Sequence, residues 1–396
     1  MKLVARKYIL PFILISSLFF IWGFARAVLD VLNKHFQELL SISITQSAMV
    51  QATTYLGYFL MAVPAGIYIT RRGYRSGVVG GLLLFALGAL LFIPGERVMS
   101  FPVFLTALFI IGCGLAVLET AANPYVTELG NPSTASSRLN LAQSLNGLGC
   151  ILGPVVMGGF LFSADGGSVA LPYSIMGATV LLVALIFTRV KLPEIKNDKS
   201  ESSTSDPQSI KQSISQLWAC ATFRAGVFTL FCYEIAEISI NSLFINYVTS
   251  SGWMDNSQAT FLLSFGALGL FMAARVIGSW VMSKIKAMRV LRFCAVGAAV
   301  GAILVALNIN LLSGIGLFAC YALEAIMFPT IFALTIAGVK GNVKIASSFL
   351  MMTPIGGAVG TLLMGLIADS INISTAFMIP AIAYCFVIIY TIRRKR

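Results

Sequence analysis

The sequence predicts an all-α membrane protein with twelve transmembrane helices in two six-helix halves, because of its composition, its basic residues and an internal repeat. Of its 396 residues, 58% are hydrophobic and only 11% are charged. A soluble globular domain carries about 25% charged residues. A helix that crosses a bilayer needs about 20 mostly apolar residues, so twelve spans take roughly 240 residues and leave only short loops. The chain therefore has no room for a sizeable soluble domain.

The hydrophobic spans can be placed one by one. They cover residues 9–33, 46–69, 76–94, 101–126, 138–162, 172–190, 223–248, 258–282, 288–307, 312–337, 346–367 and 373–392. The first span follows basic residues, as a signal peptide does, but it is too long and lacks a small-residue cleavage site. A polar tract begins at Lys191, after the sixth span. We therefore predict an N-terminal half over residues 1–190, a cytoplasmic linker over 191–222 and a C-terminal half over 223–396.

The basic residues indicate an orientation in the membrane and no nucleic-acid partner. The formal charge is +12, but most of the 27 Lys and Arg residues lie at the two termini and in every second loop. A nucleic-acid-binding protein would gather such charges on one folded soluble surface. By the positive-inside rule, both termini and the even-numbered loops are cytoplasmic.

Short motifs recur in the same order in the two halves. Glu119 and Pro124 match Glu324 and Pro329, and the small-residue pair Gly149 and Gly153 matches Gly356 and Gly360. Each match is weak by itself, but together they favour a tandem duplication with parallel topology. Major facilitator transporters have this arrangement, and they bind substrate between the halves near the bilayer midplane.

A few ionisable side chains lie inside the predicted spans. They are Arg26, Asp30, Glu119, Glu234, Glu237, Arg275 and Glu324. Each costs about 2.5–3.5 kcal/mol at the bilayer centre, so these side chains must face a cavity or one another. Arg26 and Asp30 are one helical turn apart and can neutralise each other; alternatively, Arg26 can bind an anionic substrate. For Arg275 we expect pairing within the C-terminal half.

Glu119 has a setting that suits proton transfer. No Lys or Arg lies within a helical turn of it, and Pro124 leaves a nearby backbone carbonyl without its helical donor. A desolvated carboxylate without a cation favours its protonated form, as a group that gains and loses a proton requires. The alternative is a permanently protonated side chain that bonds to another helix. Glu234 and Glu237, on one helical face, favour protonation of each other in the same way.

Amide side chains recur along the fifth span. Asn140, Gln143 and Asn146 follow one another at three-residue spacing and so stay near one helical face. Carboxamides donate and accept hydrogen bonds, as a neutral polyhydroxylated ligand requires. Aromatic side chains that can pack on a sugar ring are Trp22, Tyr233 and Phe328. Amides also join membrane helices, which is the alternative interpretation of the three amides.

Several strings of residues carry a family resemblance. They are Trp22-Gly23-Phe24, Asp30-Val31-Leu32-Asn33, Pro64-Ala65-Gly66, the segment Leu118 to Tyr125, the segment Arg138 to Gln143, and the segment Phe328 to Phe332. They resemble the fucose–galactose–glucose:proton symporter family, a branch of the major facilitator superfamily, over nearly the whole chain. The resemblance implies the major facilitator fold, alternating access, and proton-coupled import of a hexose or deoxyhexose across a bacterial cytoplasmic (inner) membrane. We expect a monomer surrounded by lipid, with the proton as coupling ion and no cofactor.

The resemblance also implies roles for individual residues. Asp30 and Glu119 match the carboxylates that the family associates with proton coupling and substrate binding. Trp22, Gln143 and Asn146 match cavity positions of fucose-transporting members. The candidate substrate-binding residues are Trp22, Arg26, Asn123, Asn140, Gln143, Asn146, Tyr233, Glu237, Asn241, Glu324 and Phe328.

Departures from the family pattern leave the sugar open. Phe328 stands where fucose-transporting members have a cavity tyrosine, and Asn241 stands where a tryptophan is expected. Arg26, Glu234 and Glu324 are charges that typical members lack. A fucose specificity therefore does not transfer to this chain.

Three other functions stay open from the sequence. One is symport of an anionic sugar derivative or another charged small solute, with Arg26 as the binding cation. Another is a nutrient sensor that binds without transport. A membrane enzyme is the third, but the chain has no HExxH motif, no phosphate loop and no CxxC pair, so we expect neither an enzyme nor a metal site. Its single histidine, His35, lies at a span end, where we expect an aqueous interfacial role.

Overall fold

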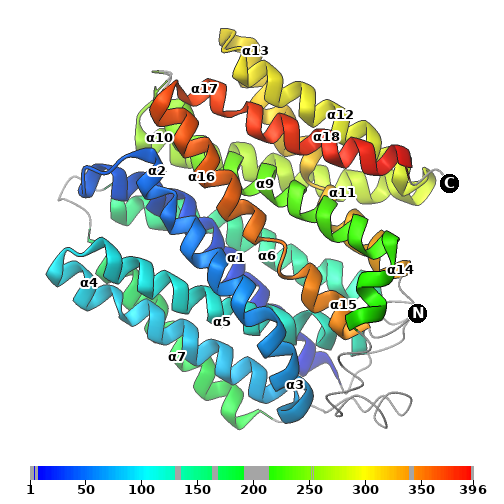
Figure 1. The fold of residues 1–396 in the computed structure, drawn as a ribbon. Helices are drawn as coiled ribbons and strands as arrows, with labels where there is room; N and C mark the ends of the chain where they lie inside the picture. Colours follow the sequence, from blue (N-terminus) through cyan, green and yellow to red (C-terminus); the bar gives the residue numbers. More distant parts are fainter. Residues whose placement is uncertain are drawn as a thin grey trace.

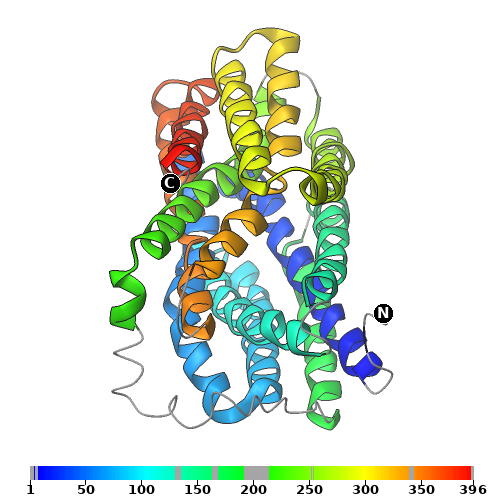
Figure 2. The ribbon, with the colours of Figure 1, turned by 90° about the vertical axis from the view of Figure 1, so that its right-hand side faces the viewer.

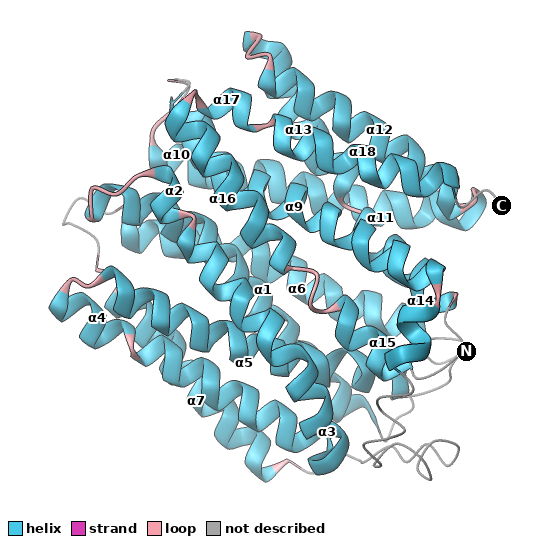
Figure 3. Cartoon of the chain, in the orientation of Figure 1, coloured by secondary structure: helices cyan, strands magenta, loops and turns pink. Residues whose placement is uncertain are grey.

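The computed structural model describes residues 8–129, 135–162, 168–190, 214–250, 254–338 and 343–393, together with Val4 and Gly252. Within these residues all regular elements are helical and no strand occurs (Figure 3). Among the same residues, 12 helical segments are long and apolar enough to cross a membrane. The predicted all-α class with twelve spans is confirmed.

The N-terminal half supplies the first six spans. Its helices are α1 (Ile9–Leu39), α2 (Ile44–Ser47), α3 (Met49–Leu90), α4 (Phe92–Val98), α5 (Phe101–Glu128), α6 (Ala135–Leu161) and α7 (Ala170–Arg189). The element α3 contains both the second and the third span. The chain reverses between them at Gly73, whose φ of 81° and ψ of 166° suit a residue without a Cβ atom.

The C-terminal half supplies the other six spans. Its helices are α9 (Ala221–Ser250), α10 (Asn256–Phe261), the π-helix η3 (Leu262–Leu268), α11 (Gly269–Lys284), α12 (Ala287–Ala306), α13 (Asn310–Glu324), α14 (Met327–Ala337), α15 (Val343–Leu350), α16 (Ile355–Ser370), α17 (Ile373–Ala376) and α18 (Met378–Arg393). Residues 191–213 of the predicted linker lie outside the described residues. Residues 214–219 are helical, and α9 begins at Ala221, two residues before the predicted start of the half.

The tenth span is divided into α13 and α14 directly after Glu324. Pro329 has no N–H to donate to the carbonyl of Ala325, four residues earlier, so the regular helix cannot continue there. Arg275 of α11 supplies the missing donor, because its Nε lies 3.0 Å from that carbonyl oxygen. The expectation that Arg275 pairs within the C-terminal half is confirmed.

The helices form two groups that follow the order of the chain. Figure 1 shows α1 to α7 on one side of the bundle and α9 to α18 on the other, and Figure 2 shows the same division after a quarter turn. The start of α1 and the end of α18 lie at one end of the bundle, here called the terminal end. The opposite end, which carries α2, α4, α10 and α17, is called the far end.

Glycines of α6 bring its backbone against the backbone of α1. A Cβ atom on Gly149 would lie 2.3 Å from the carbonyl oxygen of Phe20, and one on Gly153 would lie 2.8 Å from that of Phe24. Such distances leave no room for a side chain. The two helices therefore pack closely over one full turn, as small-xxx-small pairs permit in membranes.

The same contact recurs in the C-terminal half. A Cβ atom on Gly356 of α16 would lie 2.3 Å from the carbonyl oxygen of Phe231, and one on Gly360 would lie 2.4 Å from that of Ile235 in α9. The carbonyls that receive the glycines are four residues apart in both halves. The repeated glycine pairs of the sequence thus make equivalent helix–helix contacts.

Candidate functional site

Arg26 joins the two halves in the middle of the bundle. It lies on α1, and its Nη2 is 2.7 Å from Oε2 of Glu237 and 3.7 Å from Oε2 of Glu234, both on α9. Its Nε donates to the hydroxyl of Tyr55 on α3 at 3.1 Å. Of the Arg26 side chain, 34% remains accessible to solvent. The guanidinium is therefore already paired with carboxylates of this chain.

Asp30 has a neutral partner. Its Oδ1 accepts a hydrogen bond from Nε2 of Gln51 on α3 at 2.8 Å, and the residue is buried. No ion pair between Arg26 and Asp30 occurs among the described residues, so the predicted pairing one turn apart on α1 is not formed. Arg26 instead points across the interface, where α9 presents two carboxylates.

Glu119 on α5 also receives a neutral donor from α3. The hydroxyl of Tyr58 donates to its Oε1 at 2.9 Å. Gln51, Tyr55 and Tyr58 are four and three residues apart and therefore share one face of α3. This face contacts Asp30, Arg26 and Glu119 in turn.

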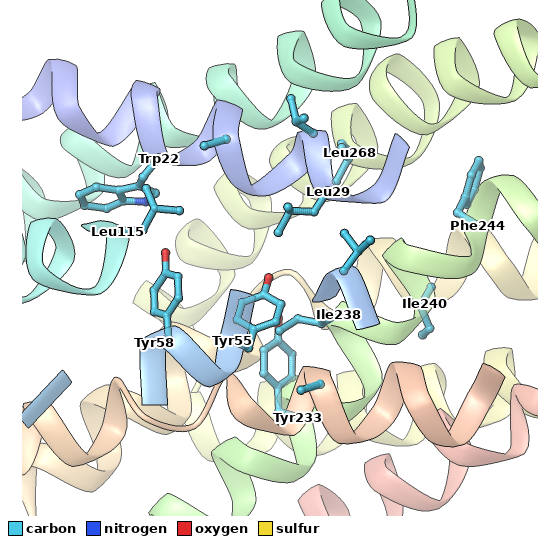
Figure 4. Packing of buried hydrophobic residues seen from close by; sticks show 14 of the residues in the cluster. Trp22, Leu29, Tyr55, Tyr58, Leu115, Tyr233, Ile238, Ile240, Phe244 and Leu268 are labelled. Atoms are coloured by element: carbon cyan, nitrogen blue, oxygen red, sulfur yellow. The ribbon is translucent and has the colours of Figure 1, made fainter. Parts of the chain in front are cut away.

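The polar face of α3 at the site was not predicted from the sequence. Figure 4 shows the hydroxyls of Tyr55 and Tyr58 directed toward α1, which carries Trp22, and the two phenol rings are 5.7 Å apart. The signal was present in the second span as polar and aromatic residues at positions 51, 55 and 58. Spacing alone does not say which neighbour such a face contacts.

The amides of α6 do not all face a ligand. Nδ2 of Asn146 donates to the backbone carbonyl of Phe19 at 3.2 Å, so Asn146 joins α6 to α1. This contact supports the alternative that amides hold helices together. Gln143 is half-buried, and no hydrogen bond of its side chain is recorded within the described ranges. The side chain of Asn140 lies outside the described residues.

Two other amides carry unpaired oxygens. Oδ1 of Asn123, one turn after Glu119, and Oδ1 of Asn241, one turn after Glu237, are buried without a hydrogen-bond partner in the described part of the chain. Nδ2 of Asn241 donates to Oε1 of Glu237 at 3.4 Å. A buried acceptor without a donor is unfavourable by about 1–3 kcal/mol. Hydroxyl groups of a ligand would supply such donors.

The remaining predicted residues lie in aromatic surroundings. The ring of Trp22 packs on Phe19 with centroids 4.1 Å apart, and the ring of Tyr233 lies 6.4 Å from that of Phe328. Glu324 is fully buried and accepts a hydrogen bond from the hydroxyl of Tyr384 on α18. Its recorded contact is thus within the C-terminal half.

His35 does not lie at an aqueous interface, so that prediction is wrong. The first helix continues to Leu39, beyond the predicted span end at residue 33. His35 thus lies inside this helix, not at its end. Its side chain is buried, and its ring centroid is 6.4 Å from that of Phe36 and 6.0 Å from that of Phe162.

Further polar contacts join α1 to α9 toward the far end. Nδ2 of Asn33 donates to Oγ of Ser242 at 2.9 Å. One turn later, the amides of Gln37 and Asn246 bond to each other. Both pairs are 209 residues apart in sequence, which is consistent with parallel helices at equivalent positions of a repeat.

Asp369 forms another contact between the halves at the far end. It lies near the end of α16, and its two carboxylate oxygens accept hydrogen bonds from the backbone N–H groups of Ile44 and Thr45, at 3.1 and 2.8 Å. These amides begin α2 and have no partner within their own helix. The carboxylate therefore ties α16 to the entrance of the second span.

The described part of the site shows no metal-binding geometry. In the described ranges, no group of three or more His, Cys, Asp or Glu side chains could hold a metal ion. Its chemistry is that of buried carboxylates with neutral donors, one paired guanidinium and amides with spare acceptors. Such groups can transfer protons and bind hydroxyl groups.

Comparisons with known proteins agree on one family. Residues 14–350 match the model of the Major Facilitator Superfamily. The chain is 36% identical to the L-fucose-proton symporter of Escherichia coli (strain K12), over 99% of this chain and 94% of that protein. It is 33% identical to a glucose/galactose transporter of Brucella abortus biovar 1 (strain 9-941), over 95% of this chain and 92% of that protein.

Solved structures show the same architecture. The E. coli fucose:proton symporter matches with a TM-score of 0.75 and 35% identity, over 99% of this chain and 100% of that chain. A D-xylose-proton symporter also matches with a TM-score of 0.75, at 14% identity, over 97% of this chain and 96% of that chain. The latter likeness concerns the fold alone.

Proposed function

Since the chain belongs to the Major Facilitator Superfamily, we propose that it is a proton-coupled symporter that imports a monosaccharide by alternating access. It is an integral membrane protein, and its relatives are transporters and not enzymes. The names of those relatives, a fucose-proton symporter and a glucose/galactose transporter, support a hexose or deoxyhexose as substrate.

One observation carries the proton-coupled part of the proposal. Asp30 and Glu119 are two carboxylates inside the bundle whose recorded hydrogen bonds come from neutral donors, Gln51 and Tyr58. A carboxylate paired with a cation would stay ionised throughout the cycle, whereas one held by neutral donors can be protonated and deprotonated. We assign the proton-coupling role to these two residues.

The cycle begins with the far end open. A sugar and the coupling protons enter, and protonation of Asp30 and of Glu119, one proton each, removes the penalty for enclosing their charges in an apolar interior. The two halves then rock about the site, and the terminal end opens. A membrane potential supplies about 2.3 kcal/mol per 100 mV for each proton, and a pH gradient supplies about 1.4 kcal/mol per unit.

The sugar site that we propose lies between the halves, close to Arg26. The ligand hydroxyls would bond to Asn123, Asn241 and Gln143, and Trp22 would pack on the sugar ring. The unpaired buried oxygens of the two asparagines support this assignment. We assign Asn146 a supporting role at the site, because its Nδ2 joins α6 to α1.

We further propose that the protein works as a monomer in the bacterial cytoplasmic membrane, with both termini, the terminal end and the 191–222 linker in the cytoplasm. The halves on either side of that linker are residues 1–190 and 223–396. Basic residues at the termini and in alternate loops support this orientation.

Uptake by purified protein in liposomes tests the function. An inward proton gradient should drive accumulation of at least one labelled hexose or deoxyhexose, and a proton ionophore should abolish it. Counterflow of the same sugar without a gradient separates a transporter from a sensor, because a sensor binds without flux. Binding without counterflow would contradict the proposal.

A further inference from the structure

The ion pair between Arg26 and Glu237 has no part in the proton-coupling step proposed above, and its position between the halves points to another role. We propose that Glu237 determines substrate specificity: by neutralising Arg26, it makes the site bind uncharged sugars and reject hexuronates. This inference rests on the proposed function, since it concerns the substrate of the same site. It assigns to Glu237 the choice between neutral and acidic sugars.

The charge balance around Arg26 disfavours an anion. Arg26 lies within 4 Å of two carboxylates, at 2.7 and 3.7 Å. Glu234 is fully buried and Glu237 nearly so, so water screens their charges poorly. A sugar carboxylate that approached the guanidinium would meet both of them. Like charges brought together at an interface cost several kcal/mol.

The free hydrogen-bonding groups near Arg26 suit hydroxyls instead. The guanidinium has five N–H donors, and its recorded bonds start from Nε and Nη2. Nη1 has no recorded partner in the part of the chain that is described, while Oδ1 of Asn241 is an acceptor without a donor. A hydroxyl group can accept from Nη1 of Arg26 and donate to Oδ1 of Asn241, whereas an ionised carboxylate can only accept.

Replacement of Glu237 by glutamine isolates the effect of its charge. The amide has the same shape, and its oxygen can still accept from Arg26, so the packing is retained. The closest negative charge is lost, and among the described residues Glu234, at 3.7 Å, is then the one carboxylate left within 4 Å of the guanidinium. An incoming carboxylate can then form a charge-assisted bond with Arg26, because one carboxylate opposes it there instead of two.

The experiment compares binding of matched sugars to purified full-length protein. The probes are D-glucose with D-glucuronate and D-galactose with D-galacturonate, because each pair differs only at C6. The readout is the ratio of Kd values, uronate over neutral sugar. We expect a ratio of at least about ten for the unaltered protein and a decrease of about tenfold or more in Glu237→Gln.

Two further variants identify the mechanism. Arg26→Gln combined with Glu237→Gln should restore the rejection of uronates, because the cation that would bind them is gone. Glu38→Gln is the matched control: it removes a carboxylate that contacts Asn256 at the far end, and its ratio should not change. If Glu237→Gln does not fold, Glu234→Gln should lower the ratio in the same direction but less, because of its longer distance to Arg26.

The outcomes separate this inference from the proposed function. Equal binding of uronates and neutral sugars by the unaltered protein overturns the inference. So does an unchanged ratio in Glu237→Gln, or in Glu234→Gln where that variant is used, while neutral sugars still bind. Neither result affects proton-coupled uptake of a neutral sugar. Absence of binding and uptake for every monosaccharide instead overturns the proposed function.

Discussion

The hydroxyl of Tyr58 lies 2.9 Å from Oε1 of Glu119, so a neutral donor on α3 holds a carboxylate on α5. Both helices belong to the N-terminal half, and the bond can persist while the halves move against each other. It stabilises the ionised carboxylate, which is the form that remains after the proton has been released. A hydrogen bond to a charged group contributes about 1.5–3 kcal/mol.

Tyr58→Phe should therefore slow net uptake more than exchange. Net uptake requires Glu119 to release its proton, and the variant removes the donor that stabilises the product of this step. A loss of about 1.4 kcal/mol corresponds to roughly a tenfold slower step. Sugar counterflow, which needs no proton release, should change much less. The measurement is initial rates of both processes in the same liposome preparation.

Tyr68→Phe is the control for that variant. Tyr68 also lies on α3, but it is exposed, with 46% of its surface accessible. Its loss of a hydroxyl should leave both rates unchanged. Equal slowing of uptake and counterflow in Tyr58→Phe would mean that Tyr58 stabilises the fold or binds the sugar, and that it does not assist proton release.

Gly149→Ala should destabilise the protein through the contact between α6 and α1. The new Cβ atom would lie 2.3 Å from the carbonyl oxygen of Phe20, so one backbone must move. Overpacking of this kind costs about 1–3 kcal/mol. Gly159→Ala on the same helix is the control, because a Cβ atom there has nothing within 4 Å. Thermal unfolding in detergent should show a lower midpoint for the first variant only.

Asp369→Asn should favour opening of the far end. The change weakens two hydrogen bonds from Ile44 and Thr45 that cross between the halves, because a neutral acceptor binds less strongly than a carboxylate. Spin labels on the far-end turns of the two halves should report a larger population of long distances. Labels at the terminal end should report the opposite change.

Asp255→Asn provides the comparison for the far end. Asp255 also accepts a backbone amide, from Gln258, but this bond lies within the C-terminal half. The substitution weakens a similar bond, but this bond does not join the two halves. An equal shift of the spin-label distances in both variants would contradict the view that Asp369 holds the far end closed.

The fold was predictable because the bilayer imposes strict lengths and polarities on its spans. The glycine pairs of α6 and α16 marked the repeat correctly, since close backbone contact restricts those positions to small residues. The buried carboxylates were also predictable, because ionisable residues are rare in apolar spans. These signals can be recognised from residue types and their spacing, without knowledge of which helices pack against each other.

The partners of those residues were harder to predict. Local spacing suggested that Arg26 pairs with Asp30, but its partner Glu237 is 211 residues away in the chain. Similarly, the spacing of Asn146 fits both a ligand-binding face and a contact between helices, and only the position of α1 decides between them. Helix order in the bundle, which the sequence does not encode locally, determines such contacts.

Sugar transport by Glu119→Gln tests the proton-coupling role most directly. The amide keeps the shape of the side chain and can still accept the bond from Tyr58, but it cannot carry a proton through the cycle. We predict no accumulation of sugar under an inward proton gradient, together with binding and counterflow close to those of the unaltered protein. Full gradient-driven accumulation by this variant would contradict the assignment of Glu119.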